Sequence, residues 1–298
     1  MDKKKQSLKA IFAEALEYYQ KKDFKTVEIY CYKILNINPN HFDSLSLLSN
    51  LFAINKDFDK AKEFLEKATK IEPENTTILN NLGTAYRELG NTEKAITLYQ
   101  KVLGINSNHT NANYNLGLIF YKLKELKRAK EYLEKTVKIQ PNYAFAHYSL
   151  GNLQKELNEL KQAKESYLKA IKIRPSFASA QNNLGLVFSN ISDRDSAMEC
   201  YKKALEIDPK HAGAYNNLGR LYTESGELEK AIESHKMAMK LEPQNLVHTY
   251  YLNELDKNFL NSEVKNKTEE ILNNKETYRI NLVYGNFLLS RYERNENN

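Results

Sequence analysis

Length, composition and charge already exclude several classes of protein. The chain has 298 residues, and its 44 lysine and arginine residues against 38 aspartate and glutamate residues give a formal net charge of +6. Because the two signs are interspersed along the sequence, the charge predicts a solvated surface and no nucleic-acid partner. No stretch approaches the roughly 18 consecutive apolar residues of a membrane-spanning helix, so no membrane partner is predicted.

The cysteines and the first residues indicate a cellular location. Cys31 and Cys200 are the only two cysteines and lie far apart in the sequence. A disulfide framework is therefore excluded, and a reducing compartment fits best. The segment from Met1 to Tyr19 has neither the apolar core nor the small-residue cleavage site of a signal peptide. We therefore expect a cytoplasmic protein.

A period of 34 residues runs through most of the sequence. Five glycines that each follow a leucine recur at this interval: Gly83, Gly117, Gly151, Gly185 and Gly219. All six prolines share one register of the same period: Pro39, Pro73, Pro141, Pro175, Pro209 and Pro243. A fixed period of this length predicts a stacked-repeat architecture.

Placing these prolines at position 32 divides the chain into seven repeats: 8–41, 42–75, 76–109, 110–143, 144–177, 178–211 and 212–245. Within each repeat, apolar residues recur every three or four positions in two blocks separated by a polar break. This spacing predicts two helices, A and B, joined by a tight turn. We therefore expect an all-α fold, in which residues 1–245 form the repeat array and residues 246–298 form capping helices or part of a further repeat.

Three helices are expected after the last proline. The apolar spacing predicts them over Leu246–Leu260, Val264–Leu272 and Tyr278–Tyr292. The first is expected to pack on the seventh repeat as a cap. The last resembles a helix A without a helix B, so it either folds back on the array or begins a longer structure.

Small residues at two positions indicate how helices A and B fit together. Position 8 is glycine in five repeats, and position 20 is alanine in six. A glycine inside a helix costs roughly 1 kcal/mol relative to alanine. We expect a close approach of the two helices across these positions to offset that cost, with larger side chains at positions 11 and 24 filling the space between neighbouring repeats.

The residues that recur at fixed repeat positions resemble the pattern of a known repeat family. In the third repeat, positions 7, 8, 11 and 20 hold Leu82, Gly83, Tyr86 and Ala95. Together with proline at position 32, this pattern is similar to that of tetratricopeptide repeats, over residues 8–245. The resemblance implies a right-handed superhelix of paired α-helices, in which the A helices line a concave groove.

The position that faces the groove in that family carries polar residues in this chain. From the third repeat onward, position 6 holds Asn81, Asn115, Ser149, Asn183 and Asn217. Because an amide carries both a donor and an acceptor, asparagine can bind the N–H and C=O of an extended peptide whatever its side chains. The run resembles the asparagine ladder in the superhelical repeat region of O-linked N-acetylglucosamine transferases. A solvated inner face without a ligand explains the same residues.

Useful affinity requires pockets beside the ladder, because four hydrogen bonds at roughly 1 kcal/mol each correspond to millimolar binding. The candidates on the same face are Asn80, Asn182, Asn216, Tyr114 and Tyr148 at position 5, Arg220 at position 9, and Arg87, Tyr121 and Lys155 at position 12. They predict a polar groove with scattered positive charge, which suits an extended, acidic peptide. No lysine occupies position 5, so the clamp with which similar repeats hold the C-terminal carboxylate of chaperones is missing.

The sequence contains no constellation for catalysis. His41, His109 and His211 share position 34 at widely separated repeat boundaries, so we interpret them as loop residues and not as metal ligands. Cys31 and Cys200 fall in B helices and are expected to be buried. Phosphate-binding loops, nucleophile elbows and Cys-x-x-Cys pairs are missing. The sequence therefore predicts no enzyme activity, no metal and no cofactor.

Three functional hypotheses follow. The first is a scaffold for protein–protein interaction, whose groove binds an extended peptide or a partner protein. The second is the substrate-recognition arm of a larger sulfotransferase or glycosyltransferase, because the segment from His248 to Tyr292 resembles the bridge to the catalytic domain in bacterial repeat-sulfotransferases. The third is a homodimer formed through the exposed helix Tyr278–Tyr292.

Overall fold

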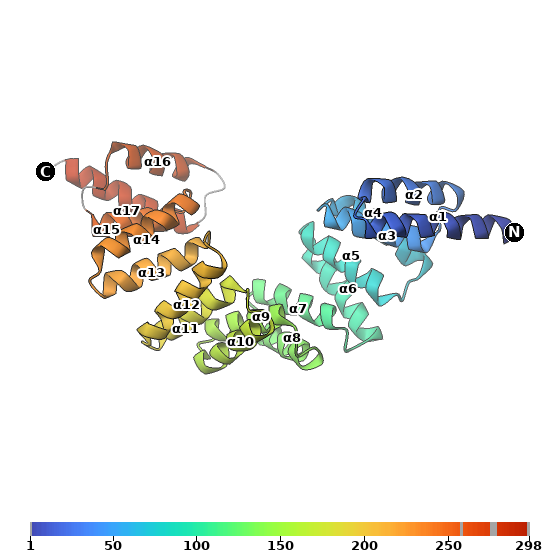
Figure 1. Cartoon of the computed structure of the whole chain (residues 1–298), viewed down its shortest axis with the longest axis horizontal. Coiled ribbons are helices and arrows are strands. Elements are labelled where there is room, and N and C mark those ends of the chain that lie inside the picture. The colour runs from blue at the N-terminus through green and yellow to red at the C-terminus, as the bar shows by residue number, and fades with distance from the viewer. Residues whose placement is uncertain (1, 257–258, 275–278, 297–298) are drawn as a thin grey trace. The chain divides into compact units, whose positions relative to one another are not determined.

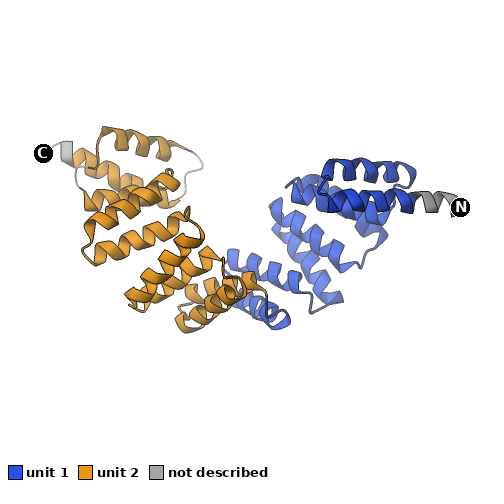
Figure 2. Ribbon diagram, in the orientation of Figure 1, with its two compact units in different colours: residues 1–142 blue, residues 143–298 orange. Residues whose placement is uncertain are grey.

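The computed structural model describes residues 2–256, 259–274 and 279–296, in which every regular element is an α-helix. The expected all-α fold is thereby confirmed. The chain divides into two compact units, residues 1–142 and residues 143–298 (Figure 2). The sequence indicates a different boundary at residue 245, between the repeat array and the C-terminal helices. That boundary stays a prediction.

Unit 1 consists, in its described part, of helical hairpins that follow one another along the chain (Figure 1). Their first helices are α1 (Asp2–Gln20), α3 (Phe42–Ile54), α5 (Thr76–Glu88) and α7 (Thr110–Lys122). Their second helices are α2 (Phe24–Ile37), α4 (Phe58–Ile71), α6 (Thr92–Ile105) and α8 (Leu126–Ile139). Each second helix packs on the first helix of its own hairpin and, within the unit, on the first helix of the next hairpin. We number the hairpins from 1 along the chain and call their helices A and B.

Unit 2 continues the same design. Hairpins 5, 6 and 7 pair α9 (Ala144–Glu156) with α10 (Leu160–Ile173), α11 (Ala178–Asn190) with α12 (Arg194–Ile207), and α13 (Ala212–Glu224) with α14 (Leu228–Leu241). They are followed by α15 (Leu246–Leu255), α16 (Ser262–Asn273) and α17 (Arg279–Glu296). Within the described residues, none of the helices combines the length and the apolar character that a membrane span requires.

The last three helices differ from expectation at their ends. The predicted helix Leu246–Leu260 stops at Leu255, and Leu260 is buried (8% exposed) from the segment that follows the helix. Its apolar character therefore reflects packing of a loop and not helical periodicity. The predicted helix Tyr278–Tyr292 continues to Glu296 as α17, while Tyr278 itself lies outside the described residues.

Helix α17 packs on α15 and α16, and α15 packs on α14. A buried asparagine fixes the contact between α17 and the start of α15. Asn281 Nδ2 donates to the carbonyl oxygen of Gln244 at 2.6 Å, and Asn281 Oδ1 accepts from the N–H of Leu246 at 3.0 Å. Because the first N–H groups of a helix lack partners within it, Asn281 satisfies one of them from a distant part of the chain.

The histidines at position 34 lie outside the helices, as expected, and each directly precedes an A helix as its N-cap. The Nδ1 atoms of His41, His109 and His211 each accept a hydrogen bond of 3.1 to 3.2 Å from the backbone N–H three residues on. Asn75 and Asn245 occupy the same position and cap their helices through a side-chain oxygen. Position 34 is therefore a capping position, at which an imidazole nitrogen replaces the usual oxygen acceptor in three repeats.

The turn between helices A and B has the same backbone conformation in all seven hairpins. The residue at position 15, two residues before the start of helix B, has a positive φ in each: Lys22 (60°), Lys56 (60°), Gly90 (80°), Lys124 (64°), Asn158 (59°), Ser192 (63°) and Gly226 (77°). A residue with a Cβ atom is strained by roughly 1–2 kcal/mol in this region. The repeats therefore impose the left-handed turn even where glycine is not available.

The glycines at position 8 face position 24 of the same hairpin, and not the alanine at position 20 as the sequence analysis expected. A Cβ atom on Gly83, Gly151 or Gly185 would lie 2.8, 2.8 or 2.5 Å from the tyrosine ring at position 24. The facing residues are Tyr99, Leu133, Tyr167, Tyr201 and His235, all of them almost fully buried. Glycine is thus required because a large side chain of helix B lies directly on the backbone of helix A.

Candidate functional site

Polar side chains join the A helices of unit 1 along one surface, which we call the helix A face. Asn81 Nδ2 in α5 donates to Asn50 Oδ1 in α3 at 3.4 Å, and Asn80 Nδ2 donates to Asn81 Oδ1 at the same distance. Arg87 Nη1 at the other end of α5 donates to Asn115 Oδ1 in α7 at 2.7 Å. The position-6 amides Asn81 and Asn115 therefore link neighbouring A helices.

Arg87 is bound within the protein on two sides. Besides the bond to Asn115, its Nη2 and Nε atoms donate to Glu88 Oε1 at 2.6 and 3.2 Å. Asn115 is itself buried, with 9% of its surface exposed. Because Glu88 balances the guanidinium charge, Arg87 acts here as a link between α5 and α7, which leaves little of its charge for a ligand.

In unit 2, amides on the A helices form a longer chain of hydrogen bonds. Asn217 Nδ2 donates to Asn182 Oδ1 at 2.9 Å, and Asn182 Nδ2 donates to Asn183 Oδ1 at 3.1 Å. Asn183 Nδ2 then donates to Asn152 Oδ1 at 2.8 Å, and Tyr167 Oη donates to the same oxygen at 2.7 Å. The chain joins α13, α11, α9 and α10 through partly buried groups.

Two further candidates take part in internal packing. The hydroxyl of Tyr148 accepts a second hydrogen bond from Asn183 Nδ2 at 3.3 Å, and its ring lies 4.8 Å from that of Phe177. Asn216 Oδ1 lies 3.3 Å from Nδ1 of His248 in α15. The phenol and the amide thus connect neighbouring helices of unit 2.

The remaining candidates differ in their exposure. Ser149 is buried (8% exposed), and Lys155 is half-buried, so that desolvation lowers the pKa of its ammonium group. Tyr114 and Tyr121 are half-buried, and Lys124 Nζ lies 5.6 Å from the ring centroid of Tyr121. Arg220 is exposed. Among these five residues, Arg220 is therefore the most accessible to a ligand.

The amides of the ladder differ in how much bonding capacity they retain. An amide side chain can make about four hydrogen bonds. Within the described residues, Asn183 uses both donors and its oxygen, whereas Asn81 uses one donor and its oxygen, and Asn217 uses one donor. A bound peptide would therefore meet more unused capacity at Asn81 and Asn217 than at Asn183.

Sequence reasoning missed the partners of the ladder. Asn50 and Asn152 occupy position 9 of repeats 2 and 5, and each accepts from the position-6 asparagine of the next repeat. The signal was present, since asparagine recurs at position 9 one repeat before Asn81 and Asn183. Only knowledge of how hairpins stack shows that position 9 of one repeat lies beside position 6 of the next.

A pocket opens beside the ladder in unit 1, with a volume of about 430 Å³. Asn50, Asn81 and Thr84 supply polar groups to it from α3 and α5. Its apolar lining includes Ala53, Ile54, Phe58 and Leu65. The pocket thus places amides next to a space that suits an uncharged side chain.

Two residue choices in hairpin 2 account for this pocket. Position 12 holds Ala53, where other hairpins carry larger side chains such as Tyr121 and Lys155. Position 24 holds Leu65, where hairpins 3, 5 and 6 carry the tyrosines that fill the space over position 8. Smaller side chains at both positions leave the volume unfilled.

The structure offers no nucleophile at the cysteines. Cys31 and Cys200 are free thiols and are buried, as expected from the sequence. Burial raises the pKa of Cys31 to about 12 and that of Cys200 to about 11, so both stay protonated at neutral pH. In the described ranges, no group of three or more His, Cys, Asp or Glu side chains is placed to hold a metal ion.

Family models match most of the repeats. Models of the tetratricopeptide repeat, also named TPR repeat, match residues 42–75, 64–97, 83–124, 110–143, 151–191, 178–211 and 200–233. Together they extend over residues 42–143 and 151–233, which is more than half of the chain. This chain is a tetratricopeptide repeat (TPR) protein. No curated protein matches it significantly.

Several solved structures have a similar fold. MamA is 29% identical, over 55% of this chain and 95% of its own, with a TM-score of 0.51. A TPR protein from Parabacteroides merdae is 20% identical, over 84% of this chain and 99% of its own, with a TM-score of 0.64. YrrB, described as a TPR protein with an unusual peptide-binding site, is 24% identical over 62% of this chain and 96% of its own, with a TM-score of 0.53.

These comparisons establish the repeat family and a fold typical of binding scaffolds. All of the matching family models are models of TPR repeats. The finer resemblances, to the ladder of O-linked N-acetylglucosamine transferases and to the bridge of repeat-sulfotransferases, stay predictions.

Proposed function

We propose that this TPR protein is a binding scaffold that holds an extended segment of a partner protein on the helix A face. In unit 1, an apolar side chain of the segment enters the pocket beside Asn81. The composition of the pocket supports the proposal, because Asn50 and Asn81 lie beside the apolar Ala53 and Leu65. Amides suit the N–H and C=O of a peptide, and the apolar lining suits one of its side chains.

The amides and the apolar lining of the pocket are expected to contribute different amounts to the binding free energy. A hydrogen bond from the ladder contributes roughly 1 kcal/mol net. Burial of a leucine-sized side chain contributes roughly 1.5–3 kcal/mol. The apolar pocket is therefore the larger contribution, while the amides set the direction and register of the peptide.

The ladder residues are proposed to contribute unequally. Asn81 and Asn217 keep the most bonding capacity, and Arg220 is the accessible cation on the same type of face in unit 2. Asn183 holds together Asn152, Asn182 and Tyr148, so its replacement would change stability as well as binding. A binding test is therefore best made at hairpins 2 and 3.

Filling the pocket is expected to weaken peptide binding. Peptides selected from a random library on the wild-type protein would be labelled, and their affinity would be measured by fluorescence anisotropy. We expect Ala53→Tyr to lower the affinity at least roughly tenfold, about 1.4 kcal/mol, because the ring occupies the space for the apolar side chain. Hairpins 1 and 4 already carry Tyr19 and Tyr121 at this position, so the fold accommodates the change. Asn81→Ala should cause a smaller loss, of roughly fivefold, for one hydrogen bond.

Thr223→Tyr is the matched control, because Thr223 holds the same position in hairpin 7 and is exposed. It should leave the affinity unchanged. Far-UV circular dichroism would confirm that all variants keep their helical content. The proposal is wrong if the selected peptides bind Ala53→Tyr and Asn81→Ala as tightly as they bind the wild type.

The transferase-arm alternative rests on the resemblance of the segment from His248 to Tyr292, and it stays a prediction. Gly285 of this segment belongs to α17, where a Cβ atom would lie 2.7 Å from Leu272 and 2.9 Å from Leu246. Close packing of α17 on α15 and α16 thus accounts for Gly285 without a catalytic domain.

Self-association through α17 is a second proposal, which the exposed apolar side chains of this helix support. Ile280, Val283 and Phe287 lie three and four residues apart on one side of α17 and are 50%, 62% and 40% exposed. An apolar stripe of this kind is typical of helices that pack on a further surface. A second copy of the chain would present the same stripe, as a two-fold interface requires.

We expect Val283→Glu to abolish the dimer, because two buried carboxylates would then face each other without partners. Ile29→Glu is the matched control, since Ile29 is a similarly exposed aliphatic residue (60%) on α2. Multi-angle light scattering over a range of concentrations measures the result. A wild-type protein that stays monomeric at its highest soluble concentration would rule out this interface.

A further inference from the structure

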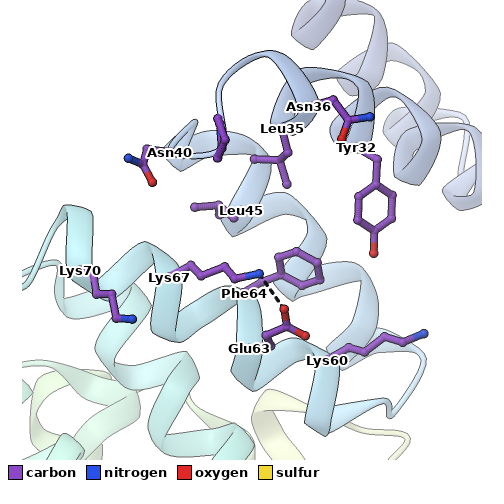
Figure 3. Close-up of a pocket in the computed structure, with 11 residues that line it drawn as sticks. Tyr32, Leu35, Asn36, Asn40, Leu45, Lys60, Glu63, Phe64, Lys67 and Lys70 are labelled. Atoms are coloured by element: carbon purple, nitrogen blue, oxygen red, sulfur yellow. Dashed lines mark hydrogen bonds and ion pairs between the residues drawn. The ribbon is translucent and has the colours of Figure 1, made fainter.

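A second cleft lies between the B helices of hairpins 1 and 2, and its volume is about 530 Å³ (Figure 3). Leu35 from α2, Leu45 from α3 and Phe64 from α4 give it an apolar lining. Tyr32 reaches from α2 toward Phe64, and their ring centroids are 6.1 Å apart at an interplanar angle of 63°. Because it is built mainly from B helices, this cleft is separate from the ladder and its pocket.

The border of the cleft is positively charged. Lys60, Lys67 and Lys70 project from one side of α4, seven and three residues apart. Glu63 is the acidic residue among the described side chains that line the cleft, and it lies 2.6 Å from Lys67 Nζ. Lys60 Nζ is 3.4 Å from Asp57, and the side chains of Lys60 and Lys67 are 56% and 50% exposed. Lys60 and Lys67 thus have a carboxylate beside them, and Lys70 supplies the positive charge in excess of these ion pairs around an apolar floor.

Position 25 distinguishes this cleft from the corresponding places in other hairpins. Hairpin 1 has Tyr32 there, whereas hairpins 2 and 4 have Glu66 and Glu134. Lysines recur at positions 26 and 29, for example as Lys169 and Lys172 in hairpin 5, so lysine alone is not distinctive. The combination of an aromatic side chain at position 25 with three lysines on the next B helix is what makes the cleft both apolar and cationic.

We propose that this cleft is a second docking site, for an acidic peptide segment that carries one large apolar side chain. The apolar side chain would rest on Leu35, Leu45 and Phe64, and carboxylates on either side of it would meet the three lysines. Charge complementarity favours such a partner, since exposed cations at a docking surface steer and select acidic segments.

The test uses a fluorescent peptide with a central phenylalanine flanked by glutamates, and a second peptide in which the phenylalanine is alanine. We expect the first to bind the full chain and the second to bind at least roughly tenfold more weakly. Binding should weaken as salt is added, because the lysines are exposed. Lys67→Glu combined with Lys70→Glu should reduce the affinity at least roughly tenfold. Tyr32→Glu should have the same effect, and it introduces the residue that hairpin 2 carries at this repeat position, Glu66.

Lys169→Glu combined with Lys172→Glu is the matched control, because both lysines are exposed and hold the same repeat positions in α10. Ala53→Tyr should also leave this binding unchanged, which separates the cleft from the pocket on the helix A face. The inference is overturned if the acidic peptide does not bind, if it binds the Lys67 and Lys70 variant as tightly as the wild type, or if single-stranded DNA of equal charge binds more tightly than the peptide.

Discussion

Replacing Gly185 by alanine is expected to lower the free energy of unfolding of unit 2 by about 2 kcal/mol. The added Cβ atom would lie 2.5 Å from Cε1 and 2.8 Å from Cδ1 of Tyr201, whose side chain is 1% exposed. The ring has no free space into which it can move, because it also packs on Leu218 and Leu221 of the next hairpin. The expected loss exceeds the gain of roughly 1 kcal/mol that alanine brings to an exposed helix.

Two further variants identify the cause of that loss. Gly104 lies inside α6 with no atom within 4 Å of its Cβ position, so Gly104→Ala should stabilise the protein slightly. Gly185→Ala combined with Tyr201→Leu should recover most of the loss, because hairpin 2 already pairs Ser49 with Leu65 at these positions. Urea unfolding followed by circular dichroism measures all three. Equal stability of Gly185→Ala and the wild type would show that the ring does not require glycine.

The same contact shows where sequence reasoning succeeds and where it stops. The periods of glycine and proline, together with the apolar spacing inside each repeat, are enough to predict the helix pairs. They are enough because each repeat encodes its own turn and apolar stripes. They were not enough to show which residue faces Gly185. Ala197 at position 20 and Tyr201 at position 24 are one helical turn apart on the same side of α12, so the spacing is compatible with either partner.

The candidate site was predictable in its residue types but not in its contacts. The 34-residue period was enough to identify the amides at position 6. The hydrogen bonds from Asn81 to Asn50 and from Asn183 to Asn152 depend on how one hairpin stacks on the next, which the period does not give. The pocket at Ala53 was missed because it arises from a locally small side chain, which the repeat pattern does not mark. A repeat pattern records what the repeats share, whereas alanine at position 12 of the repeat occurs in hairpin 2 alone.

The largest pH effect is expected in hairpin 7, where His235 replaces the tyrosine or leucine that hairpins 2 to 6 have at position 24. Its side chain is fully buried and faces Gly219, and its ring is stacked on Tyr251 at a centroid distance of 5.0 Å. Neither ring nitrogen has a hydrogen-bond partner among the described residues. Burial, with smaller contributions from His248 and Arg220, lowers the pKa of His235 to about 4.

A histidine whose pKa is lower in the folded state destabilises the fold as the pH falls, because the unfolded chain binds the proton more readily. The loss begins near pH 6.5, the ordinary pKa of the group, and is complete below the folded pKa of about 4. A difference of this size corresponds to about 3 kcal/mol. The pKa of His248 is also lowered by burial, against an opposing effect of Glu242, so it adds to the loss in the same direction.

His235→Leu is therefore expected to remove most of the loss of stability between pH 6.5 and pH 4, and to raise stability at neutral pH by about 1–3 kcal/mol through removal of the unpaired ring nitrogens. Leucine fits because Leu133 already faces Gly117 in hairpin 4. His211→Asn is the matched control, since asparagine caps the equivalent helices at Asn75 and Asn245 and the acid sensitivity should persist. Urea unfolding at several pH values, with hydrogen exchange to locate the change, measures the effect. If His235→Leu loses stability with falling pH as steeply as the wild type, a different group controls the acid response.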